Sequence, residues 1–374
     1  MKQFFLAFVI NILILLLFLA GGEWFLRNTN KVRTASAVGI PIYQSDPLRS
    51  YAHQPGSNAR NGYGDPPPEI YIDAQGLRTS ESAQQINTDS SDKKVLLLGD
   101  SFTFGTGLAY EETFAGILDE KYTVYNAGVV GHTTDQYYLA LKEFSQTVDL
   151  DAVVINFFTG NDLTEHRRHK RFYEDGDLTR VEDLKITVQD KMLYSKDRIE
   201  PSLYVIEFLI DRWDILVAKL FHTTPSEPTL TWPAYLTENH PAQDPQLETY
   251  WNLSEKDLQQ IQDYCKKNSI ELLITIIPMD VQIDMNYLKK YPNAPFTVAD
   301  YDAQRPQQRL NTFCATQKIE CLDLLPAFRA FELKDELYFQ NEDPHFDVLG
   351  HQLTAQLIES ILESGLESGL IEYE

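Results

Sequence analysis

Residues 94–101 read KVLLLGDS, a short apolar run that ends in Gly-Asp-Ser. An uninterrupted apolar stretch of this length, stopped by a glycine, is typical of a strand buried on both faces of a parallel sheet. In an open α/β sheet the ligand lies beyond the carboxyl ends of the strands. The sequence therefore predicts that Asp100 and Ser101 lie at a functional edge of such a sheet.

The same pattern recurs along the chain, with strand-like apolar runs separated by segments of helical spacing. Further strands are predicted at residues 122–125, 152–158, 271–277 and 319–322, and helices at 111–120, 133–148, 255–267 and 349–362. Strands that alternate with helices indicate βαβ units around a parallel sheet. The main domain is expected to cover residues 93–365, with an insertion at about 165–250 where the alternation stops.

Residues 1–30 are expected to form a transmembrane signal anchor. In the 19-residue stretch 4–22, Asn11 is the only polar side chain. A helix of that length rises about 28 Å, close to the thickness of the hydrocarbon core. Cleavage of this segment as a signal peptide is the alternative.

Two further segments flank the domain. Residues 31–92 are rich in Pro and Gly and are expected to form a linker and a small accessory segment, with a strand and a turn near 69–78. Residues 366–374 are expected to form an acidic tail.

Charge and cysteine content exclude several classes of protein. The 374 residues include 32 basic and 55 acidic side chains, a net charge of −23, so the chain lacks the basic composition of a nucleic-acid binder. Three cysteines without CxxC spacing exclude a disulfide scaffold and a zinc site of that type. We expect three reduced, buried thiols; a Cys314–Cys321 bridge is the alternative.

Three other polar segments are expected to gather at the same sheet edge as Ser101. They are Asn126-Ala127-Gly128, Gly160-Asn161-Asp162 and Asp343-Pro344-His345. An acyl-transfer site needs a nucleophile, a base, an acid that orients the base, and donors for the oxyanion. A lone GDS would indicate only a turn, but the four segments together supply each type of group.

The segments GDSFTFG, NAGVVGHTTDQ, TGND and DPHFDVLGH resemble the four conserved blocks of the SGNH hydrolase (GDSL esterase) family. The resemblance covers about residues 93–362, without 165–250. The N-terminal anchor and the GLR segment ahead of GDS are also similar to membrane-anchored bacterial members. The resemblance implies a three-layer α/β/α flavodoxin-like parallel sheet and an esterase or acyltransferase without metal or cofactor.

Carried over block by block, the resemblance assigns roles to individual residues. Ser101 would be the nucleophile, and His345 would be the base that takes its proton. The oxyanion hole would consist of the amides of Ser101 and Gly128 and the side chain of Asn161.

The acid that orients His345 has two candidates. The usual family spacing, three residues before the histidine, falls on Glu342, whereas Asp343 lies two residues before it, as in glycan-acylating branches. Pro344 pushes Asp343 toward an extended conformation, in which residues two apart share a side. We therefore expect Asp343 to be the acid, with Glu342 as the alternative.

Other polar and aromatic residues receive structural interpretations. Asp100 and Asp162 are expected to bond turn amides, and His351 to lie on a helix face. The basic run at 166–171 is expected to be a solvated turn, with recognition of an anionic glycan or lipid headgroup as the alternative. The aromatic residues of the insertion are expected to be core residues rather than a sugar platform; they are Trp213, Trp232, Tyr235 and Trp251.

Together these features predict a serine esterase that hydrolyses a carboxylic ester of a glycan or lipid. Its domain would face the periplasm or the cell exterior from a single anchor in the bacterial inner membrane. One alternative is an O-acyltransferase that modifies a cell-envelope glycan, which would need a membrane acyl-donor partner or a soluble donor. A second alternative is an anchored glycan-binding protein with a vestigial site.

Overall fold

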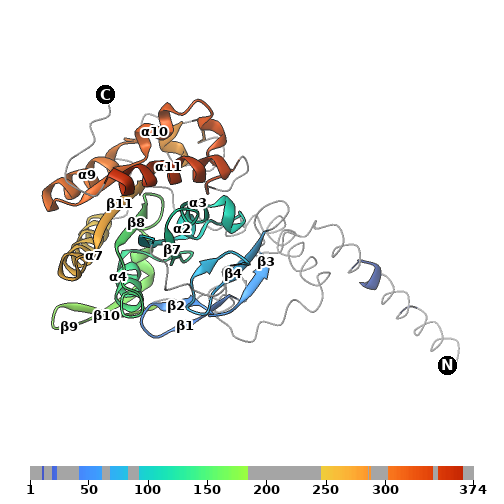
Figure 1. Ribbon diagram of the computed structural model, residues 1–374, viewed down its shortest axis with the longest axis horizontal. Helices are drawn as coiled ribbons and strands as arrows, with labels where there is room; N and C mark the ends of the chain where they lie inside the picture. Colours follow the sequence, from blue (N-terminus) through green and yellow to red (C-terminus); the bar gives the residue numbers. More distant parts are fainter. Residues whose placement is uncertain are drawn as a thin grey trace.

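A computed structural model describes residues 11, 19–22, 42–60, 68–82, 92–183, 246–284, 286–287, 302–339 and 344–364. Within these residues an eight-stranded sheet has the strand order β12-β11-β8-β6-β7-β5-β4-β3 (Figure 1). Its strands are β3 (Asn58–Arg60), β4 (Glu69–Ile72), β5 (Arg78–Thr79), β6 (Lys94–Gly99), β7 (Thr123–Asn126), β8 (Ala152–Phe158), β11 (Glu271–Ile277) and β12 (Glu320–Asp323).

The α/β class is confirmed, but the sheet is mixed rather than wholly parallel. The neighbours β12, β11, β8, β6 and β7 pair in parallel, and they lie within about a residue of the predicted strands. All seven residues of β8 are buried, as expected for a central strand covered on both faces. The correction concerns one edge, where β5, β4 and β3 add to β7 in antiparallel order.

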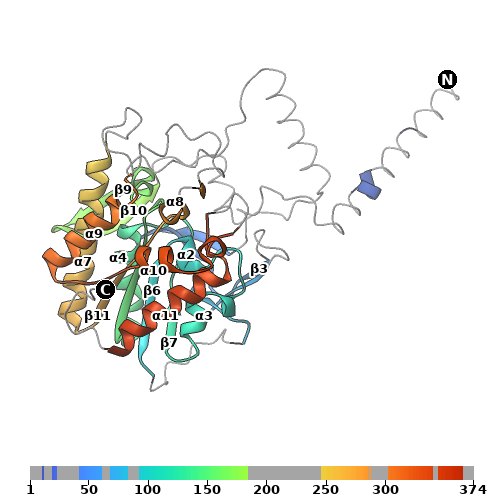
Figure 2. The ribbon, with the colours of Figure 1, turned by 90° about the horizontal axis from the view of Figure 1, so that it is seen from above.

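Helices cover both faces of the sheet. Their bounds are α2 (Ser101–Phe104), α3 (Phe114–Leu118), α4 (Thr134–Phe144), α7 (Leu247–Asn268), α8 (Asp280–Ile283), α9 (Arg305–Gln317), α10 (Leu325–Ala330) and α11 (Val348–Ser364). Short 3-10 turns are η2 (Tyr110–Glu112), η3 (Glu165–Arg168) and η7 (Lys334–Glu336). Figures 1 and 2 show α4 and α7 on one side of the sheet and α3 with α11 on the other. Arg309 of α9 pairs with Glu248 and Glu255 of α7, so α9 lies beside α7.

His351 joins the two helices of the second face. It lies on α11 with 1% of its surface exposed, and its Nδ1 accepts a hydrogen bond of 3.1 Å from the backbone N–H of Phe114. The first N–H groups of a helix have no partner within the helix. His351 therefore caps the start of α3, which agrees with the interpretation as a helix-face residue.

The segment ahead of β6 packs on the rest of the domain. Strands β1 (Tyr43–Asp46) and β2 (Ser50–His53) form a hairpin. A small apolar cluster joins this hairpin and β4 to Phe104 of α2 and Val129. The hairpin and β4 are thus in contact with the turn that carries Ser101.

A second hairpin follows η3 and consists of β9 (His169–Glu174) and β10 (Asp177–Asp183). Asp177 accepts a hydrogen bond of 2.7 Å from the Tyr138 hydroxyl of α4. Val181 N–H donates to the carbonyl of Leu48 over 2.8 Å. This hairpin is the beginning of the predicted insertion, and it lies against α4 and the β1–β2 turn.

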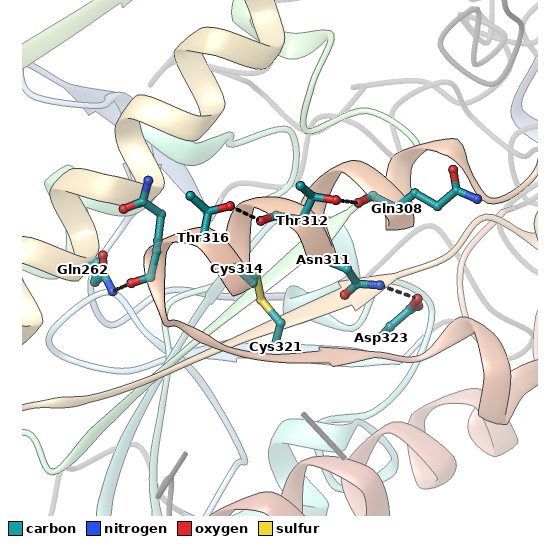
Figure 3. Close-up of a disulfide and its surroundings, with 9 residues drawn as sticks. Gln262, Gln308, Asn311, Thr312, Cys314, Thr316, Cys321 and Asp323 are labelled. Carbon is teal, nitrogen blue, oxygen red and sulfur yellow. Dashed lines mark hydrogen bonds between the residues drawn. A yellow bond between two sulfur atoms is a disulfide. The ribbon is translucent and has the colours of Figure 1, made fainter. Parts of the chain in front are cut away.

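Cys314 and Cys321 form a disulfide, so the expectation of three reduced thiols is wrong (Figure 3). Cys314 lies near the end of α9, and Cys321 lies in β12. The chain reverses through a left-handed residue, Lys318 (φ 56°), which brings the two Cα atoms to 6.2 Å. Cys265 is a free, buried cysteine.

Several expected features fall outside the described residues. No helix in the described part of the chain is long and apolar enough to span a bilayer. Of the stretch 4–22, only Asn11 and residues 19–22 belong to that part, so the anchor stays a prediction. The aromatic residues Trp213, Trp232 and Tyr235 also lie outside it, whereas Trp251 is buried in the core, as expected.

His351→Asn should make folding less sensitive to acid. Burial lowers the pKa of His351 to about 3, so the folded ring stays neutral, while the unfolded chain takes up a proton below about pH 6.5. Stability is therefore lost as the pH falls from about 6.5 toward 3. Asn keeps an acceptor for Phe114 N–H but does not titrate.

Urea unfolding at pH 7 and pH 5 measures this effect. The wild type should lose about 2 kcal/mol more between the two pH values than the variant does. An equal loss in both proteins would contradict the assignment.

Candidate active site

Strand β6 is the point from which the following strands are added to the sheet first on one side and then on the other. From β6 the chain continues to β7 on one side and then crosses to β8 on the other. Such a switch point opens a crevice at the carboxyl end of the central strand. Ser101 lies two residues after the end of β6, is the first residue of α2, and is 5% exposed.

Asp100 fixes the start of α2. Its Oδ1 accepts a hydrogen bond of 2.9 Å from the N–H of Phe102, an N-cap interaction. The carboxylate is fully buried, and this burial raises the pKa of Asp100, an effect opposed by the Phe102 hydrogen bond and the nearby His345. Asp100 thus bonds a turn amide, as the sequence predicts.

The side chains of His345 and Ser101 are in contact at the end of β6. The Nε2 atom of His345 lies 2.7 Å from Ser101 Oγ, although 244 positions separate the two residues. The backbone carbonyl of His345 accepts a hydrogen bond of 3.0 Å from Phe339 N–H. The imidazole also packs against the ring of Phe102, with centroids 5.1 Å apart.

The Ser101 hydroxyl has a second acceptor within reach, the Oδ2 of Asp100 at 3.3 Å. The contact with His345 is shorter by a wide margin, and a neutral imidazole nitrogen without a proton accepts a hydroxyl hydrogen well. This geometry suits transfer of the serine proton to Nε2.

An acid that orients His345 would act at Nδ1, because Nε2 faces Ser101. Both candidates, Asp343 and Glu342, lie outside the described residues. The choice between them stays a prediction.

The structure brings Gly128 next to α2. A Cβ atom at Gly128 would lie 2.5 Å from the backbone nitrogen of Phe104, so only glycine fits this approach. The N–H of Gly128 donates to Oδ1 of Asn126 over 3.0 Å. The amide expected to bind the oxyanion is therefore already hydrogen-bonded within its own loop.

Asn161 lies in the turn after β8. Its side chain hydrogen-bonds to the Asp100 carboxylate. Among the residues that the structure describes, its buried Oδ1 atom has no hydrogen-bond partner. Asn161 is thus adjacent to the Asp100–Ser101 turn, and its amide nitrogen carries two N–H donors, so one can bind an oxyanion while the other faces Asp100.

The Asp162 carboxylate stabilises the turn after β8 by accepting two hydrogen bonds. Its Oδ2 accepts hydrogen bonds of 3.0 Å from Phe158 N–H and from the Tyr137 hydroxyl. Burial, together with the nearby charge of Asp100, raises the pKa of Asp162 well above its usual range. Asp162 bonds a turn amide, as predicted.

The expectation of a solvated turn holds for only part of the basic run at 166–171, in which Arg167, Arg168 and Lys170 are exposed. Recognition of an anionic glycan or lipid headgroup stays a prediction. His166 and His169 are buried, and the Arg171 side chain is 7% exposed. Arg171 forms ion pairs of 3.0 Å with Asp135 and 3.1 Å with Asp257. The physical reason is that two buried carboxylates on α4 and α7 require a cation beside them.

Asp135, His166 and Asp257 have atoms close enough together to hold a metal ion. The guanidinium of Arg171 lies against all three of these residues and supplies the positive charge. Burial raises the pKa of Asp257, and Arg171 opposes this rise. We therefore assign the cluster as a buried ion-pair network.

The arrangement of Ser101 and His345 agrees with a comparison of sequence families. Residues 97–353 match the model of the GDSL-like lipase/acylhydrolase family, and the chain belongs to this family. Comparison with curated proteins finds no match.

Several solved structures are similar to this chain at low sequence identity. A GDSL-like lipase from Bacteroides thetaiotaomicron shares 13% identity with a TM-score of 0.38, over 73% of this chain and 88% of that chain. A lipase/acylhydrolase from Enterococcus faecalis shares 16% identity with a TM-score of 0.37, over 73% and 96%. A psychrotrophic esterase from Pseudoalteromonas shares 11% identity with a TM-score of 0.37, over 74% and 100%.

Proposed function

We propose that this acylhydrolase-family protein is a serine esterase that hydrolyses a carboxylic ester through an acyl-Ser101 intermediate. The observation that carries the proposal is the distance of 2.7 Å between His345 Nε2 and Ser101 Oγ. A serine hydroxyl is a weak nucleophile unless an adjacent base accepts its proton. The contact supplies that base.

The reaction would proceed in two steps. Ser101 Oγ attacks the ester carbonyl while its proton moves to His345 Nε2, and the tetrahedral intermediate then expels the alcohol, which takes the proton from His345. In the second step water gives a proton to the same Nε2 and attacks the carbonyl carbon of the acyl-serine. The bond from this carbon to Ser101 Oγ then breaks, Oγ takes the proton from His345, and the carboxylic acid leaves. The two steps together consume only the ester and one water molecule.

The negative oxygen of the tetrahedral intermediate needs donors that point at it. The backbone N–H of Ser101 and the side-chain amide of Asn161 are the donors that we assign. Gly128 would contribute by giving up or sharing its hydrogen bond of 3.0 Å to Asn126. We assign Asp343 as the acid at His345 Nδ1, with Glu342 as the alternative.

We infer that the substrate is an ester on a glycan or lipid of the cell envelope, and that the domain lies outside the cytoplasm. The apolar stretch 4–22 supports an anchor in the inner membrane. The Cys314–Cys321 disulfide supports an oxidising compartment, because cytosolic thiols are kept reduced.

A fluorophosphonate should label the purified full-length protein at Ser101. Ser101→Ala and His345→Ala should abolish labelling, because one removes the nucleophile and the other removes its base. Ser360→Ala, a change at an exposed serine of α11, is the matched control and should leave labelling unchanged. Mass spectrometry of the labelled peptide provides the measurement. Labelling that survives Ser101→Ala would show that the nucleophile is wrong, and an unreactive wild type would favour a vestigial site.

Hydrolysis of a short-chain aryl ester should depend on Asn161. Asn161→Ala should lower kcat by about 10²–10³, the usual effect of losing one oxyanion donor. Asn268→Ala, at the exposed end of α7, serves as the control. If the acyl-enzyme instead persists in water and discharges only when a glycan acceptor is added, the protein is an O-acyltransferase. The D-x-H spacing of Asp343 and His345 is the feature that favours this outcome.

A reporter that is active only in the periplasm, fused after Glu374, should be active. Long domains cross the membrane largely regardless of their charge, so the net charge of −23 is no obstacle. Activity of a cytoplasm-specific reporter at the same position would reverse the assignment of the compartment.

A further inference from the structure

Arg78 is an unusual buried cation beside the candidate site. It lies in β5, within the GLR segment, and only 1% of its surface is exposed. Buried arginines usually pair with carboxylates. The guanidinium of Arg78 instead donates hydrogen bonds to three backbone carbonyls, those of Phe104, Gly105 and Leu108.

These carbonyls belong to the end of α2 and the turn that follows it. A helix leaves its last carbonyl groups without partners in the helix, and α2 has only four residues. The left-handed Gly105 (φ 78°) returns its N–H to the carbonyls of Ser101 and Phe102. The carbonyls of Thr103 and Phe104 are bound from outside, by Asn126 Nδ2 over 2.9 Å and by Arg78.

Arg78 and Asn126 act on the same turn because they are direct neighbours. They face each other in the antiparallel pairing of β5 and β7. Asn126 holds the carbonyl of Thr103 with one end of its amide and the N–H of Gly128 with the other. The pair therefore fixes the nucleophile turn relative to the Gly128 loop.

The charge of Arg78 is compatible with its site. Its guanidinium lies 4.6 Å from the centre of the Phe104 ring, within cation–π range. Burial lowers the pKa of Arg78 to about 10, so the group remains charged at neutral pH. Burial also lowers the pKa values of His53 and His351 to about 3, which keeps these two neighbours neutral.

We propose that Arg78 is a positioning residue for catalysis, which holds the Ser101 turn and the Gly128 loop in register by binding the end of α2. This inference rests on the proposed serine chemistry. It makes strand β5 a part of the catalytic unit rather than a spacer. Arg78 is buried and its guanidinium binds backbone carbonyls, so its effect should fall on the rate of the chemical step rather than on substrate binding.

The test compares Arg78→Lys and Arg78→Met in the full-length protein, with aryl ester kinetics normalised to the folded fraction by circular dichroism. Arg78→Met should lower kcat by about 10²-fold, the scale of a misplacement near 1 Å, with KM changed less than about threefold. Arg78→Lys should recover part of the loss, because an ammonium group binds fewer of the three carbonyls than the forked guanidinium does. Added guanidinium ion should raise kcat of Arg78→Met but not of Ser101→Ala.

Arg60→Met is the matched control, since Arg60 lies in β3 of the same segment and makes an exposed ion pair of 3.1 Å with Glu69. It should retain wild-type kcat. Wild-type kcat in folded Arg78→Met would overturn the proposal, and so would a loss that disappears after normalisation to the folded fraction. An inactive, unlabelled wild type would instead overturn the proposed esterase function.

Discussion

The site depends on one constraint of chain topology, the position of β6 between β7 and β8. The chain leaves β6 toward one neighbour and returns on the other side, so the turn after Gly99 lies at the switch point of the sheet, where open α/β sheets bind their ligands. That turn carries Ser101, and the turns after β7 and β8 carry Gly128 and Asn161. His345 reaches Ser101 from the segment before α11, which a backbone hydrogen bond of 3.0 Å between Phe339 and His345 holds in place.

The sequence predicts the parallel strands correctly because these strands are continuous apolar runs. The stretches 94–98, 152–158 and 271–277 need burial on both faces, and only a central position in a sheet provides it. The antiparallel pairing of β5, β4 and β3 at the edge could not be predicted from the sequence. Strand β5 has two residues, and its pairing with β7 depends on a tertiary contact between Arg78 and Asn126.

The site was predictable in its chemical groups but not in the residues that support them. The four blocks name Ser101 and His345, and the structure brings these two side chains together. The burial of Arg171, at the end of the basic run, could not be predicted because its partner is distant in sequence: Arg171 binds Asp257, 86 positions away. A charge count cannot distinguish a solvated arginine from one that neutralises two buried carboxylates.

Two buried arginines, Arg78 and Arg171, therefore bind separate elements that support the site. Arg78 binds the end of α2, and Arg171 ties the β9–β10 hairpin to α4 and α7. The Arg171 network reaches the site through Thr133, whose hydroxyl donates to the carbonyl of Asp162 beside Asn161 and also contacts His166. A guanidinium group suits both places, since its several donors bind oxygen atoms in fixed directions. The loops around the Ser101–His345 pair are thus supported by two buried arginines that none of the four conserved blocks contains, Arg78 in the GLR segment and Arg171 in β9.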